Sequence, residues 1–318
     1  MRIVAGELSG FPHLPELPER GPGADLTGRT AALLIDMPVE VTPRGWRLGE
    51  HPGRDVQRAR SMLSSDLDAM EEVLQGYTGP LKIQLCGPWT LAATLELTRT
   101  MDAALSDSGA VADLAASLAE AAAAHAADVA KRVPGARLVV QFDEPALAAV
   151  AAGEVPTASG LSRLPAIEAD TIRERLTQVL AGNPGYTVVH CCATTVPFGI
   201  IRGAGAEAIS FDLSQLRRGE EDAVGESAEA GMGLLVGAVP AVDPADEDVT
   251  QDRGVRVARR VARLWHRLGL APDVEQVVIT PGCGLAGASP AWARAALASC
   301  REAARILPEM AAGEVDRG

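Results

Sequence analysis

The stretch Tyr186-Thr187-Val188-Val189-His190-Cys191-Cys192 decides how this sequence folds. Its first four residues are aromatic or β-branched, which is typical of a buried strand. A second stretch of the same form, Gln276-Val277-Val278-Ile279, is followed by Thr280-Pro281-Gly282-Cys283-Gly284-Leu285. If both segments are parallel strands of one sheet, an imidazole and thiols meet at the same edge. His190, Cys192 and Cys283 then suit a zinc ion, with a coordination position left for a substrate.

Strand-like and helix-like segments alternate on both sides of these two stretches. Such alternation predicts βαβ units and a parallel sheet. The expected strands cover 81–85, 137–142, 186–189, 208–211, 233–237 and 276–279, and helices are expected at 64–74, 110–132, 166–180 and 251–268. Polar or turn-forming residues follow every strand, which is typical of the active face of an α/β (β/α)8 TIM-type barrel. We therefore predict one such barrel domain over residues 1–318.

The amino-terminal part of the sequence departs from an ideal barrel. Only one further short strand candidate, Pro12-His13-Leu14-Pro15, precedes residue 81, which gives seven strands where a closed barrel needs eight. Residues 1–10 are expected to be the tail of an amphipathic helix, so the first strand is missing from this sequence. We attribute this to an assigned start that lies too late, with an incomplete protein as the alternative. Residues 39–42 and 45–48 are expected to form a hairpin inserted near the amino terminus.

Composition excludes several classes of function. The 318 residues carry a net charge of −13, which disfavours nucleic acid as a partner because phosphate binding requires basic surfaces. Five irregularly spaced cysteines indicate reduced thiols, as in the cytoplasm, and not a disulfide framework. The sequence shows neither a signal peptide nor a membrane span. Cysteine is commonly buried, so Cys86 and Cys300 are expected in the core, and His125 is expected as a partly buried helix residue.

Five motifs occur in an order that resembles the cobalamin-independent methionine synthase family. They are Cys86-Gly-Pro-Trp-Thr90, Gln141-Phe-Asp-Glu-Pro-Ala-Leu147, His190-x-Cys192, Ile209-Ser-Phe-Asp212 and Pro281-Gly-Cys-Gly-Leu285. The similarity is to the carboxyl-terminal catalytic barrel of these enzymes and to their short single-barrel relatives, a barrel shared with uroporphyrinogen decarboxylase-like proteins. It covers about residues 80–287.

The resemblance implies a zinc ion held by His190, Cys192, Cys283 and Asp212. The family usually has glutamate where this chain has Asp212, which reaches about one methylene less far. The alternative role of Asp212 is to cap the next helix. Cys191, between two ligands, is expected to point away from the metal.

The resemblance also implies methyl transfer to the thiol of homocysteine, with methionine as the product. Asp143 is expected to bind the substrate ammonium group, or else to cap a helix before Pro145. Glu16 or Glu19 is expected to supply a second carboxylate. Thr90 begins a helix whose amino terminus can face an anion, with ordinary capping as the alternative.

Three departures from the family pattern leave the methyl donor open. The first barrel strand with its Gly-Ser turn has no match, the additional amino-terminal barrel is absent, and Gly237-Ala-Val-Pro-Ala-Val-Asp243 lacks the family's histidine. The donor is therefore either methyltetrahydrofolate or a methyl-corrinoid. The alternative functions are a zinc thiol methyltransferase that uses a corrinoid protein and another thiol, and a non-catalytic thiol- or metal-binding barrel.

Overall fold

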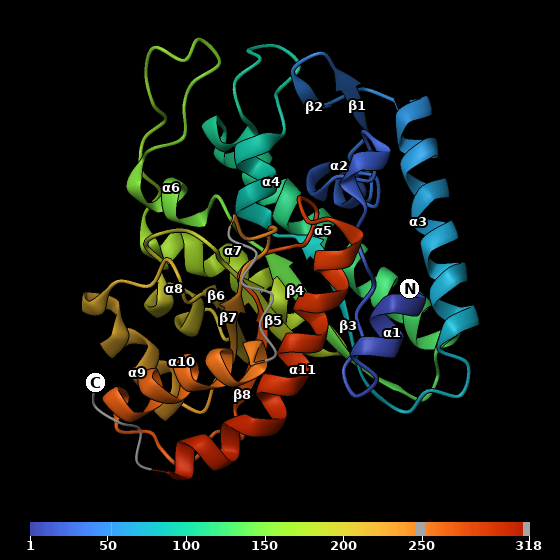
Figure 1. The fold of residues 1–318 in the computed structure, drawn as a ribbon. Helices are drawn as coiled ribbons and strands as arrows, with labels where there is room; N and C mark the ends of the chain where they lie inside the picture. Colours follow the sequence, from blue (N-terminus) through green and yellow to red (C-terminus); the bar gives the residue numbers. More distant parts are fainter. Residues whose placement is uncertain (52, 246–251, 314–318) are drawn as a thin grey trace.

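The computed structural model describes residues 1–51, 53–245 and 252–313, and its centre is a curled parallel sheet (Figure 1). The sheet has six strands, and their order in space is their order in the sequence. The strands are β3 (Gly79–Cys86), β4 (Ala136–Asp143), β5 (Tyr186–His190), β6 (Ala208–Asp212), β7 (Gly233–Val239) and β8 (Val277–Pro281). All six predicted strands are thus confirmed, and every neighbouring pair is parallel.

The strands are enriched in valine, leucine and isoleucine because helices cover the outer face of the sheet and its inner face is largely buried too. The register of the ladders places Cys86 beside Asp143, Asp143 beside His190, and His190 beside Ser210. These four residues therefore lie at one level, at the carboxyl edge of the sheet. This alignment brings the polar residues that end each strand together.

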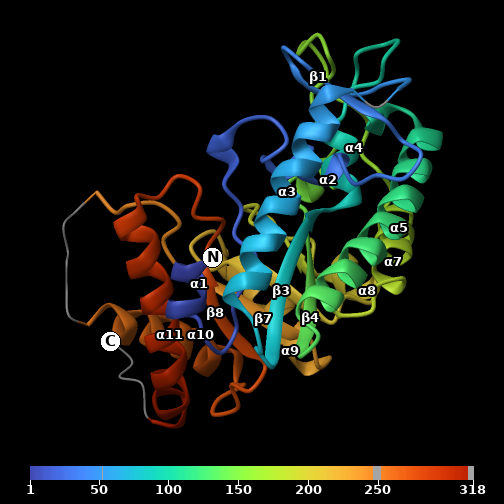
Figure 2. The same cartoon turned by 90° about the vertical axis from the view of Figure 1, so that its right-hand side faces the viewer.

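The helices pack around the outside of the sheet (Figures 1 and 2). They are α1 (Arg2–Glu7), α2 (Leu26–Ala31), α3 (Arg54–Val73), α4 (Pro88–Thr94), α5 (Ser108–Arg132), α6 (Leu147–Ala152), α7 (Ala169–Ala181), α8 (Phe198–Gly203), α9 (Glu221–Glu229), α10 (Arg253–Leu268) and α11 (Pro290–Ala312), with short 3-10 turns at Pro18–Arg20, Ala104–Ser106 and Arg218–Glu220. Contacts run from α3 to α5, α7, α8, α9, α10 and α11 in turn, so these helices form a belt. Each of the four predicted helices is present, although α3 begins ten residues earlier than expected.

The predicted closed barrel of eight strands is not confirmed. Within the described residues the sheet is open, with β3 and β8 as its edges. The candidate strand at 12–15 forms only an isolated parallel bridge, in which Leu14 N–H donates to Lys82 O and Lys82 N–H donates to Pro12 O. Proline has no N–H, so Pro12 cannot add a hydrogen bond to β3 before that of Leu14. Helix α1 was expected at residues 1–10 and packs beside α11 (Figure 2).

The predicted hairpin is confirmed as β1 (Val39–Thr42) paired antiparallel with β2 (Gly45–Leu48). Its anchor is the buried Trp46, whose indole N–H donates to the Asp25 carboxylate over 3.2 Å. The indole lies against Gly28 of α2, where a Cβ atom would come within 2.4 Å of the ring. The insertion therefore packs directly on the helices beside the sheet.

The remaining predictions for buried residues agree with the structure. Cys86, Cys191 and Cys300 are buried thiols. His125 lies in α5 and is more buried than expected, and its burial lowers its pKa to about 4, so the ring is neutral at pH 7. Among the helices of the described residues, none is long and apolar enough to span a bilayer.

Candidate metal centre

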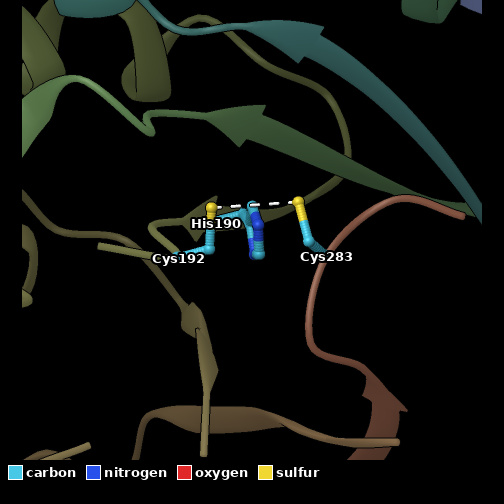
Figure 3. Close-up of side chains that lie close together, drawn as sticks. All are labelled: His190, Cys192 and Cys283. Carbon is cyan, nitrogen blue, oxygen red and sulfur yellow. Dashed lines mark hydrogen bonds between the residues drawn. The ribbon is translucent and has the colours of Figure 1, made fainter. Parts of the chain in front are cut away.

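His190 at the end of β5, Cys192 two residues later and Cys283 after β8 converge at the carboxyl edge of the sheet (Figure 3). One ligand atom from each of the three residues lies within 4.8 Å of the ligand atoms of the other two. The Sγ atoms of Cys192 and Cys283 are 3.8 Å apart. His190 is buried and Cys283 is exposed, so the group is fixed on one side and open to solvent on the other. An imidazole and two thiols at such distances are a ligand set that suits zinc.

A neighbouring strand fixes the orientation of the His190 ring. Its Nδ1 atom lies 2.9 Å from the hydroxyl oxygen of Ser210 on β6. Both residues are buried, so this hydrogen bond is protected from water. If Nδ1–H donates to the hydroxyl, Nε2 keeps a free lone pair that can bind a metal ion.

The two thiols of the centre share their protons unequally. Hydrogen bonds with Cys192 and His190 lower the pKa of Cys283 to about 4. The pKa of Cys192 is raised, chiefly by its hydrogen bond with Cys283 and by burial, which disfavours its own thiolate. A cysteine binds a metal ion as the thiolate, and the lowered pKa of Cys283 favours that form in one of the two candidate sulfur ligands.

Asp212 ends β6 but is not part of this three-residue group. Its Oδ1 accepts a hydrogen bond of 2.7 Å from the backbone N–H of Ser214, in the turn directly after β6. The next helical turns begin at Arg218 and Glu221, so Asp212 does not cap either of them. Its carboxylate also lies against Gly282, where a Cβ atom would approach the carboxyl carbon to 2.8 Å. Asp212 is therefore adjacent to the residue before Cys283, and its role as a zinc ligand stays a prediction.

Asp143 ends β4 and is buried beside the candidate metal centre. The side-chain amide of Gln141 donates to its Oδ1 over 2.6 Å. Burial raises the pKa of Asp143, while His190, Lys82 and the Gln141 hydrogen bond oppose that shift. A buried carboxylate held in this way is suited to a cationic group of a ligand.

Glu16, and not Glu19, is the second carboxylate near Asp143. Arg29 of α2 lies 3.5 Å from Glu16 and is almost fully buried. Burial raises the pKa of Glu16, Arg29 lowers it, and the negative charge of Asp143 raises it further. Lys82 stands within electrostatic reach of both acids, which raise its pKa against the effect of burial. Glu19 is exposed in a 3-10 turn.

The anion at the amino terminus of α4 is a carboxylate of this chain, Glu144. It accepts hydrogen bonds from the backbone N–H groups of Trp89 and Thr90 and from the Thr90 hydroxyl, over 2.7 to 2.9 Å. Gly87 is required there because a Cβ atom would come within 2.4 Å of Glu144. Thr90 therefore takes part in ordinary capping and does not bind an external ligand.

Several residues of this region were not identified from the sequence: Ser210, Gln141, Lys82 and Arg29. Polar residues occupy every second position on two buried strands: Lys82 and Gln84 on β3, and Gln141 and Asp143 on β4. Such residues share one face of the sheet, so this spacing was the available signal for a polar site. Arg29 had no such signal, because its place beside Glu16 depends on how α2 packs.

Comparison with known proteins agrees with this arrangement. The sequence profile described as "Cobalamin-independent synthase, Catalytic domain" matches residues 81–306, well over half of the chain. The chain belongs to the cobalamin-independent synthase family. The match includes all three residues of the candidate metal centre. Because the family is cobalamin-independent, it gives no support to a corrinoid donor.

The fold also resembles a solved structure, a B12-independent methionine synthase from Shewanella sp. W3-18-1 in complex with selenomethionine. The two chains are 18% identical, with a TM-score of 0.50. The likeness covers 76% of this chain and 66% of the other, so this chain spans just under two thirds of that structure. No curated protein matches the sequence.

Proposed function

We propose that this chain is a zinc-dependent methyltransferase that transfers a methyl group from methyltetrahydrofolate to the thiol of homocysteine and forms methionine. The observation that carries the proposal is the convergence of His190, Cys192 and Cys283 at the carboxyl edge of the sheet, beside the buried Asp143. Family membership supports the same reaction class.

The residues present fit a zinc ion. Two thiols and one imidazole match its preferred ligands, and the Ser210 hydroxyl holds the ring so that Nε2 is free. Bound zinc lowers the pKa of a coordinated thiol, so that homocysteine is available as a nucleophilic thiolate at neutral pH. We assign Asp212 as the fourth ligand, the one that homocysteine displaces.

The amino group of homocysteine is proposed to bind between Asp143 and Glu16. Asp143 is buried and Glu16 is half-buried, and Arg29 keeps the Glu16 carboxylate in place. An ammonium group bound there gains more from charge pairing than at an exposed site, because the surroundings are less polar than water.

The test combines metal analysis with a transfer assay on the purified chain. We expect about one zinc ion per chain, and X-ray absorption at the zinc edge should show an additional sulfur ligand once homocysteine is added. Methionine should form when methyltetrahydrofolate is also present. The absence of zinc, or a zinc shell that homocysteine does not change, would refute the proposed role of the metal.

The same assay separates the other candidate functions. If another thiol is methylated faster than homocysteine, that thiol and not homocysteine is the substrate. Bound zinc that gains a homocysteine sulfur, with no methyl transfer from the donor, would indicate the non-catalytic thiol-binding barrel. A Cys300→Ser variant is the matched control, since that thiol is buried in α11 outside the centre.

A further inference from the structure

Helix α10 presents a row of arginine side chains on its exposed face. Its inward face carries the buried apolar residues that pack on the sheet and on α11. The exposed face has an arginine at every third or fourth position, at Arg256, Arg259, Arg260, Arg263 and Arg267. This spacing places the five guanidinium groups on one side of the helix.

These arginines line a groove. The opposite wall consists of Leu213 and Leu216, which follow β6, and of Glu221 at the start of α9. The groove has a volume of about 570 Å³. Two more exposed arginines, Arg217 and Arg218, directly follow Leu216. Helices α9 and α10 lie side by side near this groove (Figure 1).

The charge in the groove is only partly balanced. Arg267 forms two hydrogen bonds with Glu221, of 2.7 and 3.1 Å. Arg259, Arg260 and Arg263 form no ion pair with any residue in the described parts of the chain. Like charges three or four residues apart on a helix repel each other. A concentrated positive surface on a chain of net charge −13 therefore favours a negatively charged ligand.

We propose that this groove binds an acidic polypeptide segment of a partner protein. The arginine row from Arg256 to Arg267 extends about 16 Å along the helix, which suits several carboxylates in series and exceeds the size of a single phosphate. Guanidinium groups bind carboxylates through paired hydrogen bonds. Leu216, which is half-buried, offers contact for an apolar side chain of a peptide, whereas Leu213 beneath it belongs to the core. A nucleic acid fits less well, because its sugar–phosphate backbone offers no apolar side chain to pack on Leu216.

The first experiment measures binding of a fluorescein-labelled peptide of glutamate and leucine by fluorescence anisotropy at low ionic strength. The parent chain is compared with a triple variant, Arg259→Gln, Arg260→Gln and Arg263→Gln. We expect the variant to bind about tenfold more weakly, since each exposed ion pair contributes modestly. Glutamine retains helix propensity, so thermal unfolding should remain close to that of the parent.

A second triple variant controls for total charge: Arg54→Gln, Arg58→Gln and Arg305→Gln, all exposed and on α3 or α11. It should bind the peptide as the parent does. Equal weakening in both triple variants, or no binding by the parent, would overturn the proposal. Tighter binding of a duplex DNA fragment than of the peptide would overturn it too. Zinc content and methyl transfer are measured separately, so failure here is distinct from failure of the proposed function.

Discussion

Replacing Ser210 by alanine removes the hydroxyl that contacts the imidazole of the candidate metal centre. In the structure His190 Nδ1 and Ser210 Oγ are 2.9 Å apart, and both residues are buried, with 7% and 4% of their surfaces exposed. Without the hydroxyl, the ring N–H has no partner and no access to water. Such a loss costs about 1 to 3 kcal/mol. It should therefore weaken zinc binding about 10- to 100-fold.

The assay is a zinc titration in competition with a chromophoric chelator of known affinity. Ser299→Ala is the matched control, because Ser299 is also buried and its hydroxyl donates to a backbone oxygen, Ala295 O, over 2.7 Å within α11. That variant should keep the zinc affinity of the parent. If Ser210→Ala binds zinc as tightly as the parent, zinc binding by His190 does not require the Ser210 hydroxyl, and the reasoning is refuted. Comparable weakening in both variants would instead indicate a general loss of stability.

Three further predictions concern the centre, the substrate and acid stability. Cys283→Ser should lose most of the bound zinc, measured by elemental analysis, whereas Cys300→Ser should retain it. Of these two cysteines, Cys283 belongs to the candidate centre and Cys300 does not. Asp143→Asn should raise the KM for homocysteine at least about tenfold and leave zinc content unchanged, because one charge pair with the ammonium group is lost. His125 has a pKa of about 4 in the folded chain, against 6.5 as the ordinary value. Between these values the unfolded state binds more protons, so the free energy of unfolding should fall as pH decreases from 6.5 towards 4. The free energy of unfolding, measured by urea titration, should therefore fall less between pH 7 and pH 5 in His125→Leu than in the parent, by up to about 2 kcal/mol.

Each of these predictions has a result that contradicts it. Full zinc stoichiometry in Cys283→Ser would remove that thiol from the centre. An unchanged KM in Asp143→Asn would leave Asp143 a structural role only. If the parent and His125→Leu lose the same free energy of unfolding between neutral and acidic pH, burial of the neutral His125 ring does not contribute to acid sensitivity.

The order of elements and the three residues of the candidate metal centre were predictable from the sequence. Runs such as Val188-Val189 and Val277-Ile279 can be stable only where both sides of a strand are covered, so they predict parallel strands with intervening helices. Parallel strands end at the same edge, which predicts that His190, Cys192 and Cys283 lie on one side of the sheet. Because β5 and β8 are three positions apart, the curl of the sheet (Figure 1) is needed to bring these residues together. The hairpin at residues 39–48 was also predictable, because its two short strands are local in sequence.

The surroundings of these ligands were decided by the tertiary structure. Ser210 approaches His190 because of the register between β5 and β6, and Arg29 approaches Glu16 because α2 packs at the edge of the sheet. The open sheet also depends on long-range contacts, since residues 12–15 form only an isolated bridge to β3 and, among the described residues, no strand joins them to β8. Register and helix packing depend on contacts between residues far apart in the chain. The sequence pattern identifies residues able to bind a metal, and the long-range contacts determine which neighbours orient them.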